Sequence, residues 1–127
     1  MRYLLDTHVV LWVAENSPLL SEKAKNAVLD TTAEKYVSIV SAWEVAIKLG
    51  TKKLNFIGGL PEFFKIIDEN GFTELSVERK YLPNITNLPY IHKDPFDRLI
   101  ISTALAEDLT IITIDENTQK YEVDWIW

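Results

Sequence analysis

The segment at residues 110–114 constrains the fold of this chain most. It reads Thr-Ile-Ile-Thr-Ile, so every residue is β-branched and no charged side chain interrupts it. Such a run, without alternation of charged and apolar positions, is typical of a strand buried on both faces of a parallel sheet. Parallel strands need crossover connections, which are usually helices. The segment therefore predicts strands and helices that alternate along the chain.

The rest of the sequence follows that alternation. Strand patterns occupy residues 2–5, 36–40 and 72–77, and the tail at 123–127 alternates like an edge strand. Apolar spacing of three and four residues, together with capping and breaking residues, predicts helices at residues 9–15, from Ser21 onward, at 41–49, from 60 to about 71, and at 96–107. We therefore expect an α/β protein with a mainly parallel sheet of four to five strands and helices on both faces.

Length and composition narrow the function. The 127 residues suit one domain over residues 1–127, and the net charge of −6 argues against a passive nucleic-acid coat, which is normally basic. An enzyme that acts on nucleic acid stays possible. The absence of cysteine excludes disulfides and thiolate metal sites. The longest apolar run, residues 9–14, is too short to span a bilayer, so we expect a soluble, cytoplasmic protein without a membrane partner.

Four acidic residues fall at corresponding places in the alternating pattern. Asp6 and Asp115 each end a predicted strand, whereas Glu44 and Asp97 each lie in the first turn of a predicted helix. In a parallel α/β sheet these places share one edge, where ligands bind. Carboxylates crowded into a partly dry cleft must raise their pKa values or bind a cation, and oxygen ligands favour Mg²⁺ or Mn²⁺.

Each acid also has a local structural interpretation. Ser41-x-x-Glu44 has the pattern of a capping box, and Asp94-Pro95 with Asp97 two residues on is a strong helix start. Asp6 and Asp115 suit Asx turns. Taken singly, each acid fits a capping role, so the argument for a metal site depends on their being brought together.

The motifs around these acids resemble those of PIN-domain proteins, and most of all the single-domain VapC-type toxins of bacterial toxin–antitoxin pairs. The resemblance is carried by Leu4-Leu5-Asp6-Thr7-His8, Ser41-x-x-Glu44, His92-Lys93-Asp94-Pro95-Phe96-Asp97-Arg98-Leu99-Ile100 and Ile112-Thr113-Ile114-Asp115. It covers nearly the whole chain. It implies a PIN-like three-layer α/β/α sandwich, a Mg²⁺- or Mn²⁺-dependent endoribonuclease, inhibition by a cognate antitoxin protein, and a homodimer.

The resemblance also assigns roles to residues. The family's catalytic acids correspond to Asp6, Glu44, Asp97 and Asp115 in this sequence. Asp6 and Asp97 are expected to hold the metal directly; Glu44 and Asp115 hold it through water, complete a second site, or orient the nucleophile. Asp94 and Thr113 are expected to support these groups, Asp94 as a cap and outer partner and Thr113 through its hydroxyl. Attack by metal-activated water leaves a 5′ phosphate and a 3′ hydroxyl.

Basic and apolar side chains near the motifs suggest partner contacts. Lys48, Lys93 and Arg98 flank the acids and are candidates to contact RNA or the antitoxin. The alternative is a solvated face, with Lys48 paired to Glu44 four residues earlier. The helices at residues 9–15 and 60–68 are candidates for the antitoxin groove.

Three other functions are also compatible with parts of this sequence. His8 and His92 would suit a metal-free ribonuclease that works by acid–base catalysis. A phosphotransfer receiver or an acid-dependent phosphatase on a similar sheet needs a second acid beside Asp6, which Thr7 and His8 do not supply. A non-catalytic binding module, in which every acid is a cap, predicts no affinity for metal.

Overall fold

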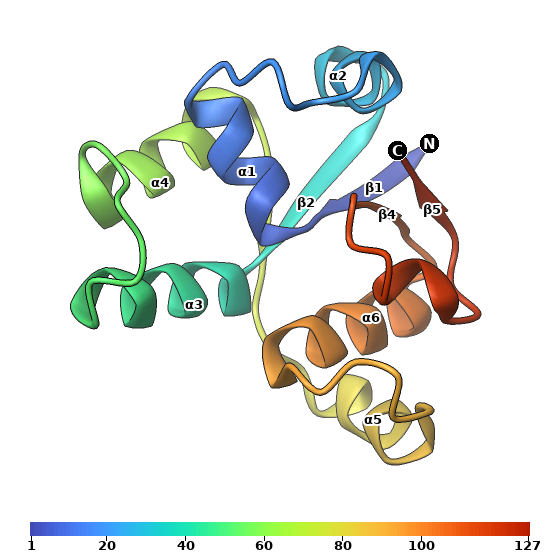
Figure 1. The fold of residues 1–127 in the computed structure, drawn as a ribbon. Coiled ribbons are helices and arrows are strands. Elements are labelled where there is room, and N and C mark those ends of the chain that lie inside the picture. Colours follow the sequence, from blue (N-terminus) through green and yellow to red (C-terminus); the bar gives the residue numbers. More distant parts are fainter.

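A single parallel sheet of five strands organises the chain. The computed structural model describes residues 1–127, and the strands lie in the order β3-β2-β1-β4-β5, with every neighbouring pair parallel (Figure 1). Their bounds are Arg2–Leu5 (β1), Glu34–Ser38 (β2), Thr73–Leu75 (β3), Thr110–Ile112 (β4) and Trp125–Ile126 (β5). The predicted sheet of four to five mainly parallel strands is confirmed.

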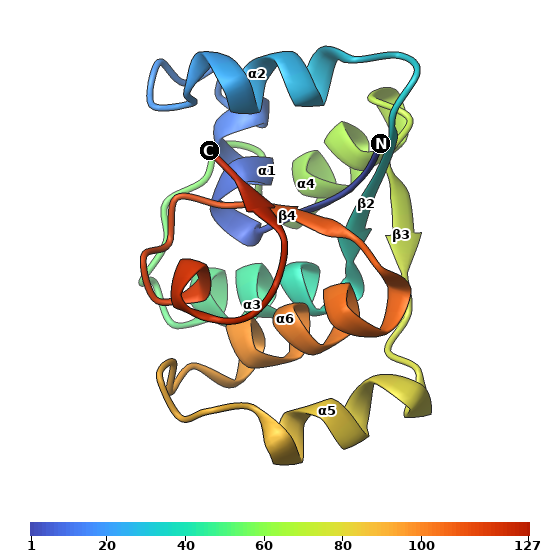
Figure 2. The ribbon, with the colours of Figure 1, turned by 90° about the vertical axis from the view of Figure 1, so that its right-hand side faces the viewer.

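Helices connect the strands and cover both faces of the sheet. Their bounds are Thr7–Ala14 (α1), Glu22–Leu29 (α2), Ile39–Gly50 (α3), Gly59–Glu69 (α4), Leu82–Asn87 (α5) and Pro95–Glu107 (α6), with short 3₁₀ turns at Arg79–Tyr81 and Thr118–Lys120. Figure 2 shows α1, α2 and α4 above the strands, and α5 and α6 below them. The predicted three-layer α/β/α sandwich is confirmed. None of these helices combines the length and the apolar character needed to cross a membrane.

The core is divided by the sheet into two apolar clusters. Adjacent residues of the central strand β1 point to opposite faces, as the two-residue period of a strand requires. Leu5 packs with residues of α1, α2 and α4, whereas Leu4 packs with Ile100 and Ile101 of α6. Both leucines are fully buried. The central strand therefore joins the two layers of helices.

The strand register fixes which ends of the strands meet. Leu5 of β1 is the partner of Val37 in β2 and of Ile112 in β4. Because these pairs are parallel, the residues that follow them emerge at one edge of the sheet. Asp6 is among them, and its backbone N–H donates to the carbonyl of Ile112 at 3.2 Å.

The helix after β2 begins earlier than its sequence pattern predicts. The β-branched residues at 36–40 predict a strand that continues to Val40, but Ser38 accepts a hydrogen bond from the Val40 N–H and caps a helix that starts at Ile39. Ser41 and Glu44 therefore lie inside α3, and both are buried. The predicted capping box is wrong, because Ser38 already supplies the cap.

The burial of Leu4 predicts that truncating it costs far more stability than truncating an exposed leucine. Leu4→Ala removes a fully buried side chain and should lower the free energy of unfolding by about 3 kcal/mol. The matched change Leu29→Ala removes a side chain that is 63% exposed and should cost less than about 0.5 kcal/mol. Urea unfolding of both variants measures the difference, and equal losses would contradict this assignment of the core.

Candidate active site

Asp6 lies where β1 joins α1 and is held from both sides. One carboxylate oxygen accepts the Val9 N–H at 3.1 Å and so caps α1, and the other accepts the Thr113 hydroxyl from the end of β4. Burial raises the pKa of Asp6, and these two hydrogen bonds partly oppose that rise. Both the predicted capping role of Asp6 and the predicted bond from Thr113 are therefore present in the same carboxylate.

Glu44 reaches the same edge from α3 and is 3% exposed. One oxygen accepts the Thr7 hydroxyl at 2.7 Å, and the other accepts the Lys48 ammonium at 2.6 Å. The hydrogen bond to Glu44 raises the pKa of Lys48. Lys48 is thus the ion-pair partner of Glu44 expected at a spacing of four residues, and it neutralises this carboxylate locally.

Asp94 and Asp97 come from the start of α6. Asp94 is the N-cap: its carboxylate accepts the N–H groups of Phe96 at 2.8 Å and Asp97 at 3.3 Å, and Pro95 takes the first helical position. Burial raises the pKa of Asp97 to about 8, and the neighbouring carboxylates, first among them Asp94 and Glu44, contribute to the rise. The helix start predicted from the sequence is present, and it places Asp97 among other acids.

Asp115 follows β4 and is better supplied with donors. Its Oδ2 accepts the Thr118 N–H at 3.2 Å and the Thr118 hydroxyl at 2.7 Å, and lies 2.7 Å from Nε2 of His92. Burial works to raise the pKa of Asp115, but the bonds from Thr118 and the proximity of His92 outweigh it, so the pKa lies below its ordinary value.

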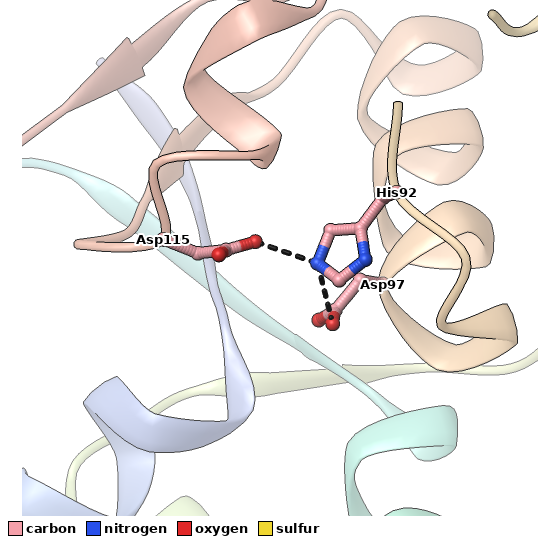
Figure 3. A group of neighbouring side chains, drawn as sticks. All are labelled: His92, Asp97 and Asp115. Carbon is pink, nitrogen blue, oxygen red and sulfur yellow. Dashed lines mark hydrogen bonds and ion pairs between the residues drawn. The ribbon is translucent and has the colours of Figure 1, made fainter. Parts of the chain in front are cut away.

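His92 lies inside this acidic site, on the irregular segment that precedes α6. Its Nε2 is 2.7 Å from Asp115 and 3.0 Å from Asp97, so the ring stands between the two carboxylates (Figure 3). One nitrogen of His92 and one oxygen each of Asp97 and Asp115 lie within 4.8 Å of one another. The sequence signal was only its nearness to Asp94 and Asp97, which says nothing of where the ring points.

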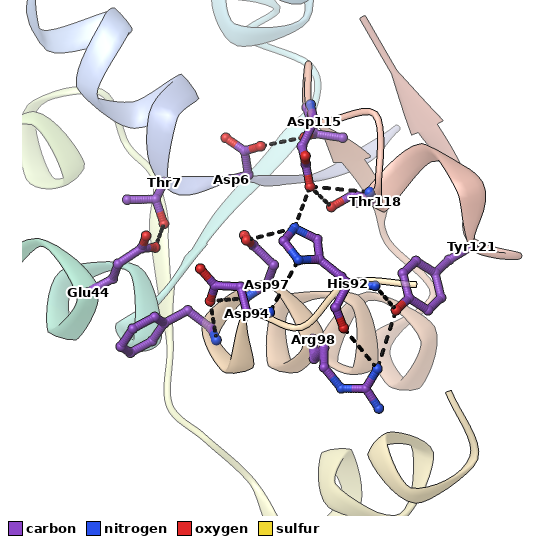
Figure 4. A network of polar contacts seen from close by, with 12 residues as sticks. Asp6, Thr7, Glu44, His92, Asp94, Asp97, Arg98, Asp115, Thr118 and Tyr121 are labelled. Atoms are coloured by element: carbon purple, nitrogen blue, oxygen red, sulfur yellow. Dashed lines mark hydrogen bonds and ion pairs between the residues drawn. The ribbon is translucent and has the colours of Figure 1, made fainter. Parts of the chain in front are cut away.

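The acids surround one hollow of about 330 Å³. Figure 4 shows the network of side chains, which come from four separate parts of the chain. The hollow is lined by Asp6, Thr7, His8, Trp12, Glu44, Lys48, His92, Asp94, Asp97, Ile114 and Asp115. Five carboxylates therefore face one small space in which Lys48 is the only lysine or arginine. The oxygen donors and the raised pKa of Asp97 fit a hard divalent cation such as Mg²⁺ or Mn²⁺.

The basic candidates separate into different environments. Lys93 is exposed, whereas Lys48 is half-buried and lines the hollow. Arg98 is only 7% exposed: its guanidinium donates to the backbone carbonyls of Ile85 at 3.1 Å, Pro89 at 3.0 Å and His92 at 3.3 Å. The expected contact of Arg98 with RNA or antitoxin is therefore corrected to an internal role, because its donors already serve the segment that precedes α6.

Comparison with known proteins identifies the family. The sequence model of the PIN domain matches residues 3–124, so the chain belongs to the PIN domain family. PIN domains are nucleases, a class of hydrolase. No curated protein matches the chain in sequence.

Solved structures share the fold at low sequence identity. VapBC2 from Rickettsia felis, bound to a DNA fragment from its promoter, is 17% identical with a TM-score of 0.73, and the match covers 100% of this chain and 99% of that one. VapBC-1 from nontypeable Haemophilus influenzae is 14% identical with a TM-score of 0.68, covering 99% and 97%. A toxin–antitoxin complex from Klebsiella pneumoniae is 16% identical with a TM-score of 0.66, covering 98% and 96%.

The raised pKa of Asp97 predicts a pH-dependent stability of the metal-free protein. The folded state holds the Asp97 proton up to about pH 8, whereas the unfolded state releases it near pH 4. Stability should therefore fall as pH rises between these values. Asn resembles the protonated side chain at every pH. In EDTA, Asp97→Asn should melt close to the wild type at pH 5 and several degrees above it at pH 9, for a gain on the order of 1 kcal/mol. A constant difference across this range would contradict the assignment.

The buried guanidinium predicts that Arg98 matters for folding. Arg98→Met leaves several carbonyls without their donor and should lower the free energy of unfolding by about 3 kcal/mol. Lys93→Met changes an exposed cation five residues earlier and should leave stability within about 0.5 kcal/mol. Chemical denaturation compares the two variants. An Arg98→Met protein as stable as the wild type would show that the arginine is not structural.

Proposed function

We propose that this PIN domain, residues 1–127, is a VapC-type toxin: an endoribonuclease that depends on Mg²⁺ or Mn²⁺ and is neutralised by a cognate antitoxin. The observation that carries the proposal is the convergence of Asp6, Glu44, Asp94, Asp97 and Asp115 on one hollow. The charge imbalance there, expressed in the pKa of Asp97, calls for a cation that the side chains do not supply.

The carboxylates have distinct proposed roles. Asp6 and Asp97 hold the cation directly, and Asp97 gives up its proton when it does so. Glu44 and Asp115 bind through water or orient the nucleophile. A bound Mg²⁺ or Mn²⁺ lowers the pKa of water and neutralises phosphate oxygens. Cleavage by in-line attack of water leaves a 5′ phosphate and a 3′ hydroxyl and makes no use of the ribose 2′ hydroxyl.

Neighbouring side chains keep these carboxylates in place. Thr113 donates to Asp6, Thr7 donates to Glu44, and Thr118 donates to Asp115. Each hydrogen bond holds one oxygen of its carboxylate and so fixes the orientation of the whole group. Residues outside the ligand set commonly orient metal ligands in this way. The network supports an acid site that is organised before any cation binds.

The RNA substrate needs cationic contacts that the acids do not offer. Lys93 is exposed in the segment just before Asp94, and Lys48 lines the hollow while it pairs with Glu44. These two lysines are our candidates for the phosphates on either side of the scissile bond. A toxin that cleaves cellular RNA acts where that RNA is found, so the proposal includes a cytoplasmic location for the chain.

Protein partners form the second part of the proposal. The solved relatives include a toxin–antitoxin complex, which supports a cognate antitoxin for this chain. Beside the packed helices α1 and α4, Ile57 is 95% exposed next to a hollow lined by Ala14, Phe56 and Glu62, and we propose that the antitoxin covers this surface.

We also propose a homodimer, for which the 58% exposed Trp43 on α3 is the candidate contact. Light scattering of the free chain and of the complex measures both assemblies.

The nuclease proposal predicts a cleavage activity tied to metal and to Asp6. Purified chain, freed of any partner, should cut RNA with Mg²⁺ or Mn²⁺, leave 5′ phosphates, and stop in EDTA. Asp6→Asn should lose at least about 100-fold in rate, since it removes a direct ligand. The control Asp68→Asn changes an exposed carboxylate on α4 and should cut normally.

Two results would contradict the proposal. Cleavage that persists in EDTA with cyclic phosphate products would assign the reaction to His8 and His92 instead. A chain that cuts no RNA and shows no Mn²⁺ binding by calorimetry would be the non-catalytic binding module, with its acids acting as caps.

A further inference from the structure

The imidazole of His92 is placed as a hydrogen-bond donor. Its Nδ1 accepts the backbone N–H of Asp94 at 3.3 Å, so that nitrogen carries no proton. In the neutral ring the proton is then on Nε2, which faces Asp115 at 2.7 Å and Asp97 at 3.0 Å. A ring nitrogen that ligates a metal must offer a lone pair, and its other nitrogen normally donates a hydrogen bond. In His92, the nitrogen that faces the acids carries the proton, and the other nitrogen accepts a hydrogen bond.

The backbone of His92 is held by two buried side chains. Its N–H donates to the hydroxyl of Tyr121 at 2.8 Å, and its carbonyl accepts from the guanidinium of Arg98 at 3.3 Å (Figure 4). The Tyr121 hydroxyl also donates to the Pro89 carbonyl at 2.7 Å and lies 3.3 Å from Nη1 of Arg98. Tyr121 and Arg98 are 6% and 7% exposed. The two side chains and the two carbonyls form one closed network.

This network replaces regular secondary structure where the chain has none. Residues 88–94 lie between α5 and α6 and belong to no helix or strand. Backbone groups of such a segment must find partners elsewhere, and here they find them in α6 and in the segment after the turn at Thr118–Lys120. The position of the His92 ring therefore depends on Arg98 and Tyr121.

We propose that Tyr121 and Arg98 are positioning residues: they hold His92 so that its Nε2–H donates to the carboxylate of Asp115, lies 3.0 Å from that of Asp97, and fixes both carboxylates for the metal. The proposal rests on the metal-dependent function proposed above. According to this proposal, His92 contacts the carboxylates and does not contact the cation. Metal affinity then depends on three residues that are not acidic: His92, Arg98 and Tyr121.

The first test measures Mn²⁺ affinity by calorimetry. His92→Leu removes the donor and should weaken binding about 10- to 100-fold, the usual effect of losing an outer partner. His92→Gln retains an N–H at a similar reach and should recover most of the affinity. Tyr121→Phe deletes only a hydroxyl and should weaken binding about 3- to 10-fold. Tyr36→Phe, on β2 away from the acids, is the matched control and should bind as the wild type does.

The second test reads the ring directly. Nitrogen-15 NMR of histidine-labelled protein should show the His92 proton on Nε2 in the metal-free chain, and the same after Mg²⁺ is added. In Tyr121→Phe this signal should broaden or shift, and the melting temperature should fall below that of Tyr36→Phe, because the His92 N–H and the Pro89 carbonyl lose their buried partner. A purely structural role for Tyr121 would change the melting temperature and leave the ring and the metal affinity unaltered.

The outcomes separate this inference from the function on which it rests. Loss of the Nε2 proton when Mg²⁺ binds would make His92 a ligand and overturn the inference, as would full affinity in His92→Leu. Failure of the wild-type chain to bind Mn²⁺ at all would overturn the proposed function. The tautomer of the metal-free protein would still test the placement of His92 in that case.

Discussion

The parallel pairing of β1 with both β2 and β4 determines where the chemistry of this chain takes place. Leu5 pairs with Val37 on one side and Ile112 on the other, so three connections leave the sheet at one edge. Asp6, α3 with Glu44, and Asp115 all follow these strands. Their side chains meet although more than a hundred residues separate the first from the last. A slip of one residue in either pairing would turn each strand's buried residues to the opposite face and separate the acids.

The cost of gathering these acids is reduced by neighbouring donors, and unequally so. Glu44 has Thr7 and Lys48, Asp115 has Thr118 and His92, and Asp6 has Thr113. Asp97 shares only the His92 ring, and it is the carboxyl whose pKa burial and its acidic neighbours raise to about 8. Asp97, at the start of α6, is therefore the carboxylate whose negative charge is least compensated by neighbouring groups. This is where a cation gains most from binding.

The strands and the positions of Asp6 and Asp115 could be predicted because the residue pattern that forms each strand also marks where that strand ends. Each acid directly follows an apolar, β-branched run, and the strand ends of a parallel sheet share an edge. Asp94 and Pro95 predicted the start of α6 because a cap and a first-turn proline are local signals. The start of α3 was missed because Ile39 and Val40 are β-branched and favour a strand, whereas Ser38 supplies a helix cap.

His92 and Arg98 could not be placed from the sequence, for a related reason. A charged side chain near acids suggests a solvent-facing contact, yet Arg98 is buried because an irregular segment needs donors for its carbonyls. His92 points into the acids because Arg98 and Tyr121 hold its backbone. Tyr121 lies 29 residues further along the chain. Such a network has no periodicity and no local motif, so only the folded arrangement reveals it.

The most direct test of this account is the anomalous diffraction of crystals of the free protein soaked in Mn²⁺. The account predicts a strong anomalous peak between the carboxylates of Asp6 and Asp97, at the edge where β1 and β4 end, and no such peak in Asp6→Asn. A peak elsewhere on the molecule, or none at a saturating concentration of Mn²⁺, would contradict the claim that the sheet gathers these acids into a metal site.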